Sequence, residues 1–476
     1  MHPRFTSLPA SLFPSRRRVA SRRSATRANR LKNRRHALAS PAAIELLESR
    51  RVLATLYVAP SFSITNDVAP SGLSNGDTVT WDSGNPDQQT GLTFGANAFT
   101  DLQAAVNGAT SGDTIRVAAG LYQLTSAVDV TKSLTILGPQ ADVDPRPSAG
   151  SARVAGGPDE AVLDGGGTVA DTFVIGADNV TINGFDLRNT LNAVIDTNPA
   201  AVYASTQILD NFVHHALSPS GGKGIRFQGV TNGIVKNNDI YDVRDDGVEV
   251  GSGSAGSSPG AVVSDNEIHD LGSNGTSNSA LYAFAVPYAT NINVTFQGNL
   301  IYNFGGNDAI KVGSKNGADR ALTGGSVLNN VVHDVVQDGI TINTSNTLVQ
   351  GNEVYNSSSD NAAIYVEHSN GGDTIANNFL HNNTAATATI LIGDLTTAPT
   401  GVVVTGNSIV NNAHNTLLFR DLGSGATVDA SANWWGSADS AVVAASVIST
   451  TPGQIDFTPW LNSGTDASTA TPGFQP

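Results

Sequence analysis

Short stretches in which apolar and polar residues alternate follow one another along most of the chain. The stretches at 224–227, 247–250, 309–312, 339–342 and 363–366 share this period of two. Such alternation is typical of a half-buried β-strand, and no stretch between them has the length and period of a helix. The pattern therefore predicts a protein built almost entirely from short strands and turns.

A second phrase, which ends on an asparagine, recurs between these strands. Its anchoring residues follow one another at steps of 22 to 33 residues: Asn211, Asn238, Asn266, Asn299, Asn330, Asn352, Asn378, Asn407 and Asn433. Two or three short strands per repeat form one coil of a parallel β-solenoid, with successive coils about 4.8 Å apart. Stacking places the asparagines in one column, where we expect their side-chain amides to hydrogen-bond to one another.

The residue three positions after each asparagine is aromatic in all but the last coils. This column reads His214, Tyr241, His269, Tyr302, His333, Tyr355, His381 and then Val410. Regularly spaced histidines resemble metal ligands, but alternation with tyrosine puts successive histidines two coils, or about 9.6 Å, apart. A zinc ion needs each nitrogen at about 2.0–2.1 Å. We therefore interpret the column as a stack of rings.

Two segments that differ from the repeat bracket the solenoid. Phe99, Leu102 and Val106 have helical spacing, and Thr100 with Gln103 fits a capping box, so we expect an N-terminal capping helix. Three of the four tryptophans lie in 433–461. Exposed solenoid ends need covering against edge-to-edge pairing, which favours a C-terminal cap and tail at 431–476. Tryptophan can also stack on sugar rings, so a sugar-binding role for these residues stays open.

Charge divides the chain into two parts. Residues 1–55 hold 13 basic and two acidic residues, whereas the remaining 421 residues hold 13 basic and 39 acidic ones. We interpret 1–55 as a disordered basic segment because it has no helical or strand period and its like charges repel. The acidic body would repel nucleic acid, so we expect no nucleic-acid partner.

Other counts exclude further classes of protein. The chain has no cysteine, which excludes disulfides, thiolate metal sites and cysteine nucleophiles. It has no run of about 18 apolar residues, so we expect no transmembrane segment. Asp outnumbers Glu 34 to 7, and Asp, Gly and Asn favour turns over helices. The expected oligomeric state is a monomer.

The end of the basic segment carries a short motif. LLESRRVLA at 46–54 resembles the N-terminal motif of large surface and exported proteins of planctomycete bacteria. An arginine-rich stretch precedes it, without the apolar core of an ordinary secretory signal. The resemblance implies export to the outside or the cell surface of a bacterium. The alternatives are a basic tail without a targeting function and a transit peptide.

The repeats and caps together resemble a known superfamily. FTDLQAAVNGATSGDTIRVAAGLY at 99–122, SLTILG at 133–138, the asparagine repeats and the closing NWWG and DFTPWL resemble right-handed parallel β-helix proteins of the pectate-lyase-like superfamily. The resemblance implies an all-β, right-handed parallel β-helix of roughly 10–12 coils with an N-terminal capping helix. It places the solenoid at 99–430, after a lead-in and cap at 56–98. The superfamily holds lyases, hydrolases, epimerases, tailspikes and adhesins, so the fold does not select a function.

Aligning the alternating strands gives two outward-facing columns. The first contains Arg226, Glu249, Tyr282, Lys311, Thr341 and Tyr365. The second contains Gln228, Gly251, Gly313, Asn343 and Glu367, where the glycines predict a shallow trough. Three carboxylates stand at the starts of these strands: Asp246, Asp308 and Asp338.

These columns suggest a site for acidic polysaccharide. Uronate lyases and epimerases need a cation on the sugar carboxylate, a base for the neighbouring C–H and a proton donor. The resemblance suggests that Asp308 and Asp338, with Asp246 as an outer ligand, bind calcium through their oxygens. Lys311 or Tyr365 would be the base, and Arg226 would bind the substrate carboxylate. The remaining sugar contacts would come from Glu249, Tyr282, Asn343 and Glu367.

The same residues have a plainer interpretation. Asp246-Gly247 and Asp338-Gly339 are ordinary turn dipeptides, Arg226 and Glu249 could form a surface ion pair, and Lys311 could pair with Asp338. A hydrolase pair drawn from Asp245, Asp246, Glu249 and Asp308 is also open. The sequence thus predicts an exported or cell-surface β-helix that binds acidic polysaccharide, and leaves open whether it cleaves or epimerises it. A non-catalytic structural or adhesive solenoid is the alternative.

Overall fold

The computed structural model describes residues 53–68, 72–216, 218, 221–251, 256–272, 279–285, 292–314, 317–414, 416–468 and 470–476. The chain divides into two units, residues 1–52 and 53–476, and every described residue belongs to the second. The predicted basic segment 1–55 and its export motif lie outside the described residues, except for positions 53–55. No helix within the described ranges is both long enough and apolar enough to cross a membrane.

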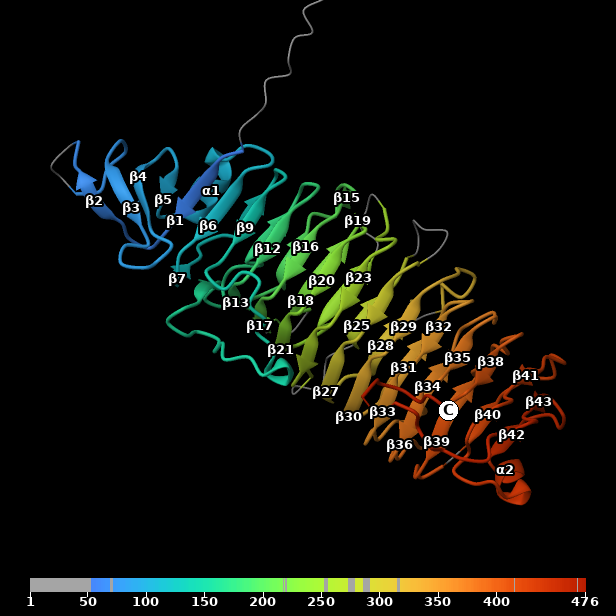
Figure 1. Ribbon diagram of the computed structural model, residues 1–476. Helices are drawn as coiled ribbons and strands as arrows, with labels where there is room; N and C mark the ends of the chain where they lie inside the picture. The colour runs from blue at the N-terminus through green and yellow to red at the C-terminus, as the bar shows by residue number, and fades with distance from the viewer. Residues whose placement is uncertain are drawn as a thin grey trace, which may run out of the picture. The chain divides into compact units, whose positions relative to one another are not determined.

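The second unit is a right-handed parallel β-helix, as predicted, and its strands form three long parallel sheets (Figure 1). In a typical coil, a strand of the first sheet leads through a two-residue asparagine turn to the second sheet, and a longer loop leads to the third. Among the described residues the first sheet contains 15 strands: β1 (Thr55–Val58), β5 (Ala98–Phe99), β6 (Thr114–Val117), β9 (Thr135–Leu137), β12 (Thr181–Asn183), β16 (Gln207–Leu209), β20 (Ile234–Lys236), β23 (Val262–Ser264), β26 (Thr295–Gln297), β29 (Ser326–Leu328), β32 (Leu348–Gln350), β35 (Thr374–Ala376), β38 (Val403–Thr405), β41 (Val428–Asp429) and β43 (Ile455–Asp456).

The other two sheets have nearly equal numbers of described strands, which fits the predicted 10–12 coils. The second sheet contains 11: β7 (Gly120–Gln123), β10 (Ala161–Asp164), β13 (Asp186–Thr190), β17 (Phe212–Ala216), β21 (Asp239–Val243), β24 (Glu267–His269), β27 (Leu300–Phe304), β30 (Val331–Val335), β33 (Glu353–Tyr355), β36 (Phe379–His381) and β39 (Ser408–Val410). The third sheet contains 12: β8 (Val128–Val130), β11 (Phe173–Ile175), β14 (Ala193–Thr197), β18 (Lys223–Gln228), β22 (Val248–Gly251), β25 (Ser279–Ala283), β28 (Asp308–Val312), β31 (Asp338–Ile342), β34 (Ala362–Val366), β37 (Ala388–Ile392), β40 (Leu417–Phe419) and β42 (Val447–Ser449).

The parallel sheets reach further along the chain than the expected range of 99–430. β1 pairs in parallel with β6, so the lead-in contributes a strand to the first coil. β42 and β43 extend the third and first sheets into the C-terminal segment. Shorter sheets flank the solenoid, an antiparallel one and a two-stranded one: β2 (Ser63–Asn66), β3 (Thr78–Trp81) and β4 (Gln89–Thr93), and β15 (Tyr203–Ala204) with β19 (Val230–Thr231).

Helix α1 (Leu102–Gly108) is the predicted capping helix, but it starts at a different residue. Asp101, and not Thr100, is the N-cap, because its side chain accepts a hydrogen bond from the backbone N–H of Ala104 at 2.7 Å. The capping box is therefore wrong. Gln103 instead accepts a hydrogen bond from the backbone N–H of Asp129 at 2.7 Å, which ties the helix to β8.

The C-terminal end is closed by α2 (Ser440–Ala445) and by aromatic packing. Trp435 is 1% exposed and belongs to the hydrophobic core. Phe457 packs against Trp460 with ring centroids 6.2 Å apart. Burial of Trp435 supports a capping role for this residue and removes its ring from any sugar.

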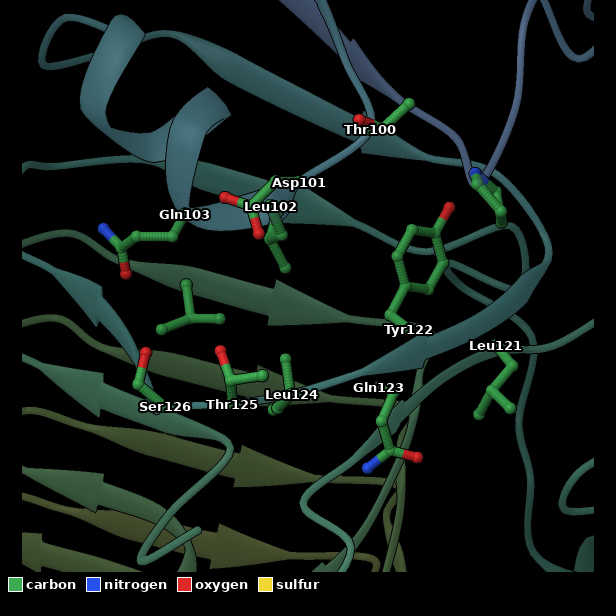
Figure 2. Close-up of a pocket in the computed structure, with 12 residues that line it drawn as sticks. Thr100, Asp101, Leu102, Gln103, Leu121, Tyr122, Gln123, Leu124, Thr125 and Ser126 are labelled. Atoms are coloured by element: carbon green, nitrogen blue, oxygen red, sulfur yellow. The ribbon is translucent and has the colours of Figure 1, made fainter.

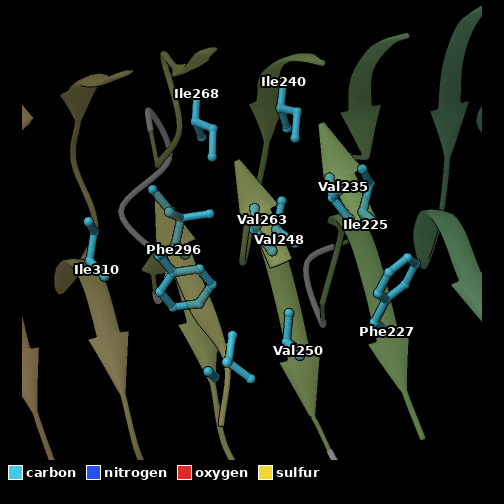
Figure 3. Packing of buried hydrophobic residues seen from close by; sticks show 14 of the residues in the cluster. Ile225, Phe227, Val235, Ile240, Val248, Val250, Val263, Ile268, Phe296 and Ile310 are labelled. Carbon is cyan, nitrogen blue, oxygen red and sulfur yellow. The ribbon is translucent and has the colours of Figure 1, made fainter. Parts of the chain in front are cut away.

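The interior of each coil is filled by apolar side chains that stack in columns. In the third sheet the inward residues are fully buried, as their alternation predicted: Ile225, Val248, Ile310, Ile340 and Ile364. Figure 3 shows Ile225 and Val248 on the neighbouring strands β18 and β22 and Ile310 on β28, which β25 separates from β22, with apolar side chains of other strands around them. Each buried aliphatic side chain contributes about 1.5–3 kcal/mol. The inward column fixes which side chains of the third sheet must point outward.

The predicted asparagine ladder is present from Asn211 to Asn433. The Oδ1 atom of each asparagine accepts hydrogen bonds from the backbone N–H and the Nδ2 of the asparagine one coil earlier, at 2.9–3.1 Å. The preceding residue always has a positive φ, and it is Asp, Asn or Gly in every coil except that of Ala432. The ladder satisfies the polar groups that the sharp bend removes from the sheets.

The aromatic column of the second sheet forms a continuous stack, which we call the ring stack: His214, Tyr241, His269, Tyr302, His333, Tyr355 and His381. Neighbouring ring centroids lie 4.6–5.3 Å apart, with interplanar angles of 3–14°. The prediction of stacked rings is confirmed. Because neighbours cover both faces of each inner ring, these rings offer no face to a sugar.

The stability of the fold is expected to depend on pH through His269, an inner residue of the ring stack. Its Nε2 lies 3.0 Å from Asp239 Oδ1 and its Nδ1 lies 2.7 Å from Asp270 Oδ2. Burial alone would lower the pKa of His269, but the two carboxylates outweigh burial and raise it from 6.5 to about 9. A raised folded-state pKa gives a stabilisation that is complete below pH 6.5 and is lost as the pH rises through about 9.

This linkage can be measured by comparing wild type with His269→Phe, which retains a ring in the stack. The free energy of unfolding should favour wild type most below pH 6.5. The difference should shrink by about 2–3 kcal/mol above the folded-state pKa. A difference that stays constant across this range would contradict the assignment of a protonated His269.

Candidate functional site

An outward-facing column of the third sheet brings together most of the residues predicted to form a site. The strand register aligns, coil by coil, Asp196, Arg226, Glu249, Tyr282, Lys311, Thr341 and Tyr365. We call these seven residues the outward column. The predicted alignment is confirmed, and Asp196 extends it by one coil.

The outward column is more enclosed than the sequence suggested. Glu249 and Lys311 are each 6% exposed, because side chains on coils about 4.8 Å apart cover one another. The predicted trough is also filled. The ring of Phe284 occupies the space above Gly251, and Asn343 occupies the space above Gly313.

Lys223 joins three carboxylates in the first half of the column. Its Nζ lies 2.6 Å from Asp245 Oδ2, 2.6 Å from Asp246 Oδ2 and 2.9 Å from Glu249 Oε2. We call these four residues the Lys223 cluster. Burial alone would lower the pKa of Lys223, but the carboxylates outweigh burial and raise it, so the ammonium group stays charged. The predicted sugar contact Glu249 is therefore held in an internal ion pair.

Arg226 forms an ion pair, but with a different partner from the one suggested. Its guanidinium contacts both carboxylate oxygens of Asp196, with Nε donating to Oδ1 at 2.8 Å and Nη2 donating to Oδ2. The suggested pair between Arg226 and Glu249 is wrong, since Glu249 binds Lys223. A planar guanidinium favours the bidentate geometry that Asp196 offers. This pairing occupies one edge of the guanidinium, that of the Nε and Nη2 donors.

Two predicted sugar contacts are largely enclosed. Tyr282 is 9% exposed, and its ring packs on Phe284 with centroids 5.1 Å apart. Asn343 is fully buried; its Nδ2 donates to the Ser314 carbonyl at 3.0 Å and its Oδ1 accepts from the His368 backbone N–H at 3.3 Å. Asn343 thus joins the loops after β28 and β34, and the aromatic pair separates the two halves of the column.

Lys311 lies at the centre of a second ionic group. Its Nζ is 3.1 Å from Asp308 Oδ2 and 3.6 Å from Glu367 Oε2. Asp308 also accepts a hydrogen bond from the Thr341 hydroxyl at 2.5 Å. The suggested pair between Lys311 and Asp338 is not formed. The side chain of Lys311 is 7% exposed and that of Glu367 is 24% exposed, so solvent reaches this group from the Glu367 side.

His368 and Asp394 extend this group, although the sequence reasoning identified neither. His368 Nδ1 lies 3.2 Å from Glu367 Oε2, without hydrogen-bond geometry, and His368 Nε2 lies 3.0 Å from Asp394 Oδ2. The strand register could have identified this pair. Ile364 pairs with Ile390, so His368 and Asp394, each four residues further on, lie opposite each other. We call this set the Lys311 cluster: Asp308, Lys311, Glu367, His368 and Asp394.

The loop after β37 fixes the charge of Asp394. Burial alone would raise the pKa of Asp394, but hydrogen bonds from the backbone N–H groups of Thr396 and Thr397 outweigh burial and lower it. A charged Asp394 at His368 Nε2 favours the tautomer with the proton on Nε2. The lone pair of His368 is then on Nδ1, which faces Glu367.

Tyr365 lies one coil beyond Thr341, beside the Lys311 cluster. Its side chain is 5% exposed, and burial together with the charge of Glu367 raises the pKa of its hydroxyl group. Tyr365 therefore keeps its proton at neutral pH. It is suited to donating a proton rather than to accepting one.

The residues suggested to bind calcium do not fit such a site. Asp246 is held by Lys223 and by the backbone N–H of Ser279 at 2.9 Å. Asp338 accepts hydrogen bonds from the segment that leads into β34 in the next coil: from Ser359 Oγ, the Asn361 and Ala362 backbone N–H groups and Asn361 Nδ2, at 2.5–3.2 Å. Asp308 is occupied by Lys311 and Thr341. Within the described ranges, no three or more His, Cys, Asp or Glu residues are arranged to hold a metal ion.

A separate cavity of about 250 Å³ lies beside α1 (Figure 2). Its lining includes Gln103, Tyr122 and Gln123. These polar groups are already satisfied: Tyr122 donates to the Ala118 carbonyl at 2.9 Å, and Gln123 donates to the Asp164 carbonyl at 2.8 Å. The cavity contains no cluster of titratable groups comparable to the outward column.

Comparisons with known proteins identify the fold class. No family model and no curated protein matches the chain. Among solved structures, the A-module of mannuronan C-5 epimerase AlgE6 from Azotobacter vinelandii is 13% identical, with a TM-score of 0.52 over 76% of this chain and 96% of that one. Pectate lyase Pel9A is 14% identical, with a TM-score of 0.46 over 88% and 82%.

A third similar structure is described as a surface adhesin. PfbA, a surface adhesin of Streptococcus pneumoniae, is 10% identical, with a TM-score of 0.34 over 67% of this chain and 85% of that one. At such identities the similarity to AlgE6 establishes the fold alone. The chain is a right-handed parallel β-helix of the pectate-lyase-like fold.

Proposed function

We propose that this chain binds acidic polysaccharide on the outer face of the third sheet and processes it at the Lys311 cluster. The observation that carries the proposal is the enclosed Lys311, which lies between Asp308 and Glu367 and next to a histidine fixed by Asp394. Burial strengthens the interaction of this ammonium group with a carboxylate. Successive coils about 4.8 Å apart also offer an extended polymer several equivalent contacts.

The proposed reaction begins with the displacement of Glu367. Glu367 is the most exposed charged residue in contact with Lys311, and its contact with Lys311 is the longer one at 3.6 Å. A uronate carboxylate takes its place on Lys311, which neutralises the substrate charge and acidifies the neighbouring C–H bond. The same displacement uncovers His368 Nδ1.

His368 and Tyr365 then act as base and acid. His368 Nδ1 removes the proton from the carbon beside the uronate carboxylate, while Asp394 stabilises the protonated ring. In elimination, the C–O bond breaks, a C=C bond forms and Tyr365 donates its proton to the leaving oxygen. In epimerisation, the C–O bond stays intact and Tyr365 donates its proton to the same carbon from the opposite face. This assignment replaces Lys311 and Tyr365 as candidate bases, because Lys311 lies between two carboxylates and the Tyr365 pKa is raised.

The comparisons support the substrate class only through the fold. The AlgE6 module is described as a mannuronan epimerase and Pel9A as a pectate lyase. We propose uronate polymers for this chain because the candidate chemistry of the Lys311 cluster suits a sugar carboxylate. The site contains no calcium in this proposal, and processing should continue in the presence of a chelator.

Substitution of Lys311 is the direct test. The full-length chain should form unsaturated or epimerised product from at least one of a panel of uronate polymers. Lys311→Ala is expected to lower kcat/KM by about 100-fold or more, since the substrate carboxylate loses its only buried counter-charge in the Lys311 cluster. Lys236→Ala is the matched control, because Lys236 is 47% exposed on the first sheet and outside the column. Full activity of Lys311→Ala would contradict the assignment of the Lys311 cluster as the active site.

A second candidate function is a non-catalytic adhesive solenoid. The Lys223 cluster and the Arg226–Asp196 pair favour it, because Lys223 and Arg226 are already paired with carboxylates of the protein. Polymer binding without any product, measured on the same panel, would favour this candidate. If the chain neither binds a polymer nor forms a product, a structural role is the remaining interpretation.

We also propose that the chain acts outside the cell or at the cell surface of a bacterium. The support is the resemblance of LLESRRVLA at 46–54 to a motif of exported proteins, and a polymeric substrate would have to be met outside the cell. The basic segment would serve delivery, and the acidic β-helix would carry the function.

A further inference from the structure

Arg420 differs from the other positive charges of the β-helix. Arg320 donates from Nε to the Gly317 carbonyl at 3.1 Å, and Lys132 donates to backbone carbonyls at the end of α1. The following basic residues each contact a carboxylate: Arg116, Arg146, Arg153, Arg188, Lys223, Arg226, Lys236 and Lys311. In the part of the chain that the structure describes, the guanidinium group of Arg420 forms neither a hydrogen bond nor an ion pair.

The strand register places Arg420 on the outer face of the third sheet. Across β34, β37 and β40, Arg420 occupies the position that Glu367 occupies two coils earlier, a separation of about 9.6 Å. The residue before each of them is buried in the core, so both side chains point outward. The position between them is Gly393, which contributes no side chain. Arg420 is partly exposed, so solvent reaches it.

The acidic residues around this guanidinium group have other partners. Beyond the outward column, the same position on β37 and β40 is occupied by Leu391 and Leu418, which carry no charge. Asp421, the next residue in the chain, accepts a hydrogen bond from the Thr450 hydroxyl group. Asp394 already belongs to the Lys311 cluster. The free donors of the guanidinium group are therefore available to an anionic ligand.

Arg420 and Glu367 act on the same hydroxyl group. Burial and the charge of Glu367 raise the pKa of Tyr365, and the charge of Arg420 acts in the opposite direction. In the proposed elimination, Tyr365 protonates the oxygen that joins two sugars. One of these sugars has its carboxylate on Lys311. The other sugar must then lie on the far side of Tyr365, toward β40 and Arg420.

On the basis of the proposed function, we propose that Arg420 binds the carboxylate of the sugar that leaves with this oxygen, so that the substrate is a polymer of consecutive uronates. The fork of N–H donors on a guanidinium group matches a carboxylate. A polymer in which uronates alternate with neutral sugars would leave Arg420 without a partner. The polymer runs along the outward column, from Lys311 past Tyr365 to Arg420.

Calorimetric titration of the full-length chain with two kinds of oligosaccharide tests the proposal. Oligomers of galacturonate, mannuronate or guluronate supply consecutive uronates, and oligomers of alternating glucuronate and N-acetylglucosamine supply isolated ones. Arg420→Gln should weaken binding of the consecutive uronates that wild type binds by about 10-fold or more. Its affinity for the alternating oligomers should equal that of wild type. Arg420→Lys should lose less, because it keeps the charge without the fork.

Two controls separate loss of a contact from loss of the fold. The urea midpoint of Arg420→Gln should equal that of wild type, because the guanidinium group has no partner among the described residues. Arg116→Gln is the matched control, since Arg116 lies on β6 of the first sheet and pairs with the exposed Asp87. It should bind both kinds of oligomer as wild type does.

Product is measured on the same samples, so that the two proposals can fail separately. If wild type binds consecutive uronates through Arg420 but forms no product, the proposed reaction is wrong and the assignment of Arg420 as a carboxylate-binding residue stands. Unchanged affinity of Arg420→Gln for the consecutive uronates would overturn this assignment. An equal loss on the alternating oligomers, the same loss in Arg116→Gln, or no binding of any oligomer by wild type would also overturn it.

Discussion

Lys223→Ala is expected to lower the free energy of unfolding by about 3–5 kcal/mol at neutral pH, because it removes one member of a buried ionic group. Lys223 is 8% exposed, and its Nζ lies within 2.9 Å of an oxygen of each of Asp245, Asp246 and Glu249. Without the ammonium group, three carboxylates remain close together and poorly solvated. Urea unfolding monitored by circular dichroism measures the change.

Lys236→Ala is the control, because Lys236 is 47% exposed and lies 3.7 Å from the exposed Asp265. It should cost less than about 1 kcal/mol. A deficit for Lys223→Ala no larger than that of the control would contradict the Lys223 cluster as a buried ion group.

Asn299→Ala is expected to cost about 3–5 kcal/mol, because it breaks the middle of the asparagine ladder. The Asn299 side chain donates to the Val263 carbonyl and to Asn330 Oδ1, each at 2.9 Å. Its Oδ1 accepts from the backbone N–H and the Nδ2 of Asn266, each at 3.0 Å. Alanine leaves the buried Asn266 N–H and the Val263 carbonyl without these partners.

The matched control for the ladder is Asn85→Ala. Asn85 is an exposed turn residue, and its amide contacts only the exposed Asp82 side chain. Its replacement should change the free energy of unfolding by less than about 0.5 kcal/mol. Equal urea midpoints for Asn299→Ala and wild type would show that the ladder contributes little to stability.

Much of the fold was predictable because a solenoid repeats one local pattern. The period of two identified the strands, and the recurring asparagine marked the same position in each coil. Once that position is known in every coil, residues at the same distance from it must lie in one column. The asparagine ladder, the ring stack and the outward column of the third sheet all follow from this rule, and the structure confirms each of them.

The candidate site was predictable only as far as the column. The register placed Arg226 next to both Asp196 and Glu249. Only the three-dimensional position of the guanidinium shows that Arg226 pairs with Asp196. His368 lies two residues after the end of β34, outside the alternating pattern of the strand. The pattern therefore did not predict its contact with Asp394. Asp338 shares a column with Asp308, but its side chain binds the loop that leads into β34 in the next coil.

The sequence by itself determined the coil and the membership of each column, because backbone pairing repeats one spacing along the stack. The tertiary structure alone decided which charges pair, which carboxylates are taken by loops and how far the outward column is covered. Side-chain rotamers and loops of unequal length set those contacts, and neither is encoded in the period of the repeat. The net charge of −15 illustrates the difference: it summarises composition, whereas the chemistry lies in a few charges that the coils enclose.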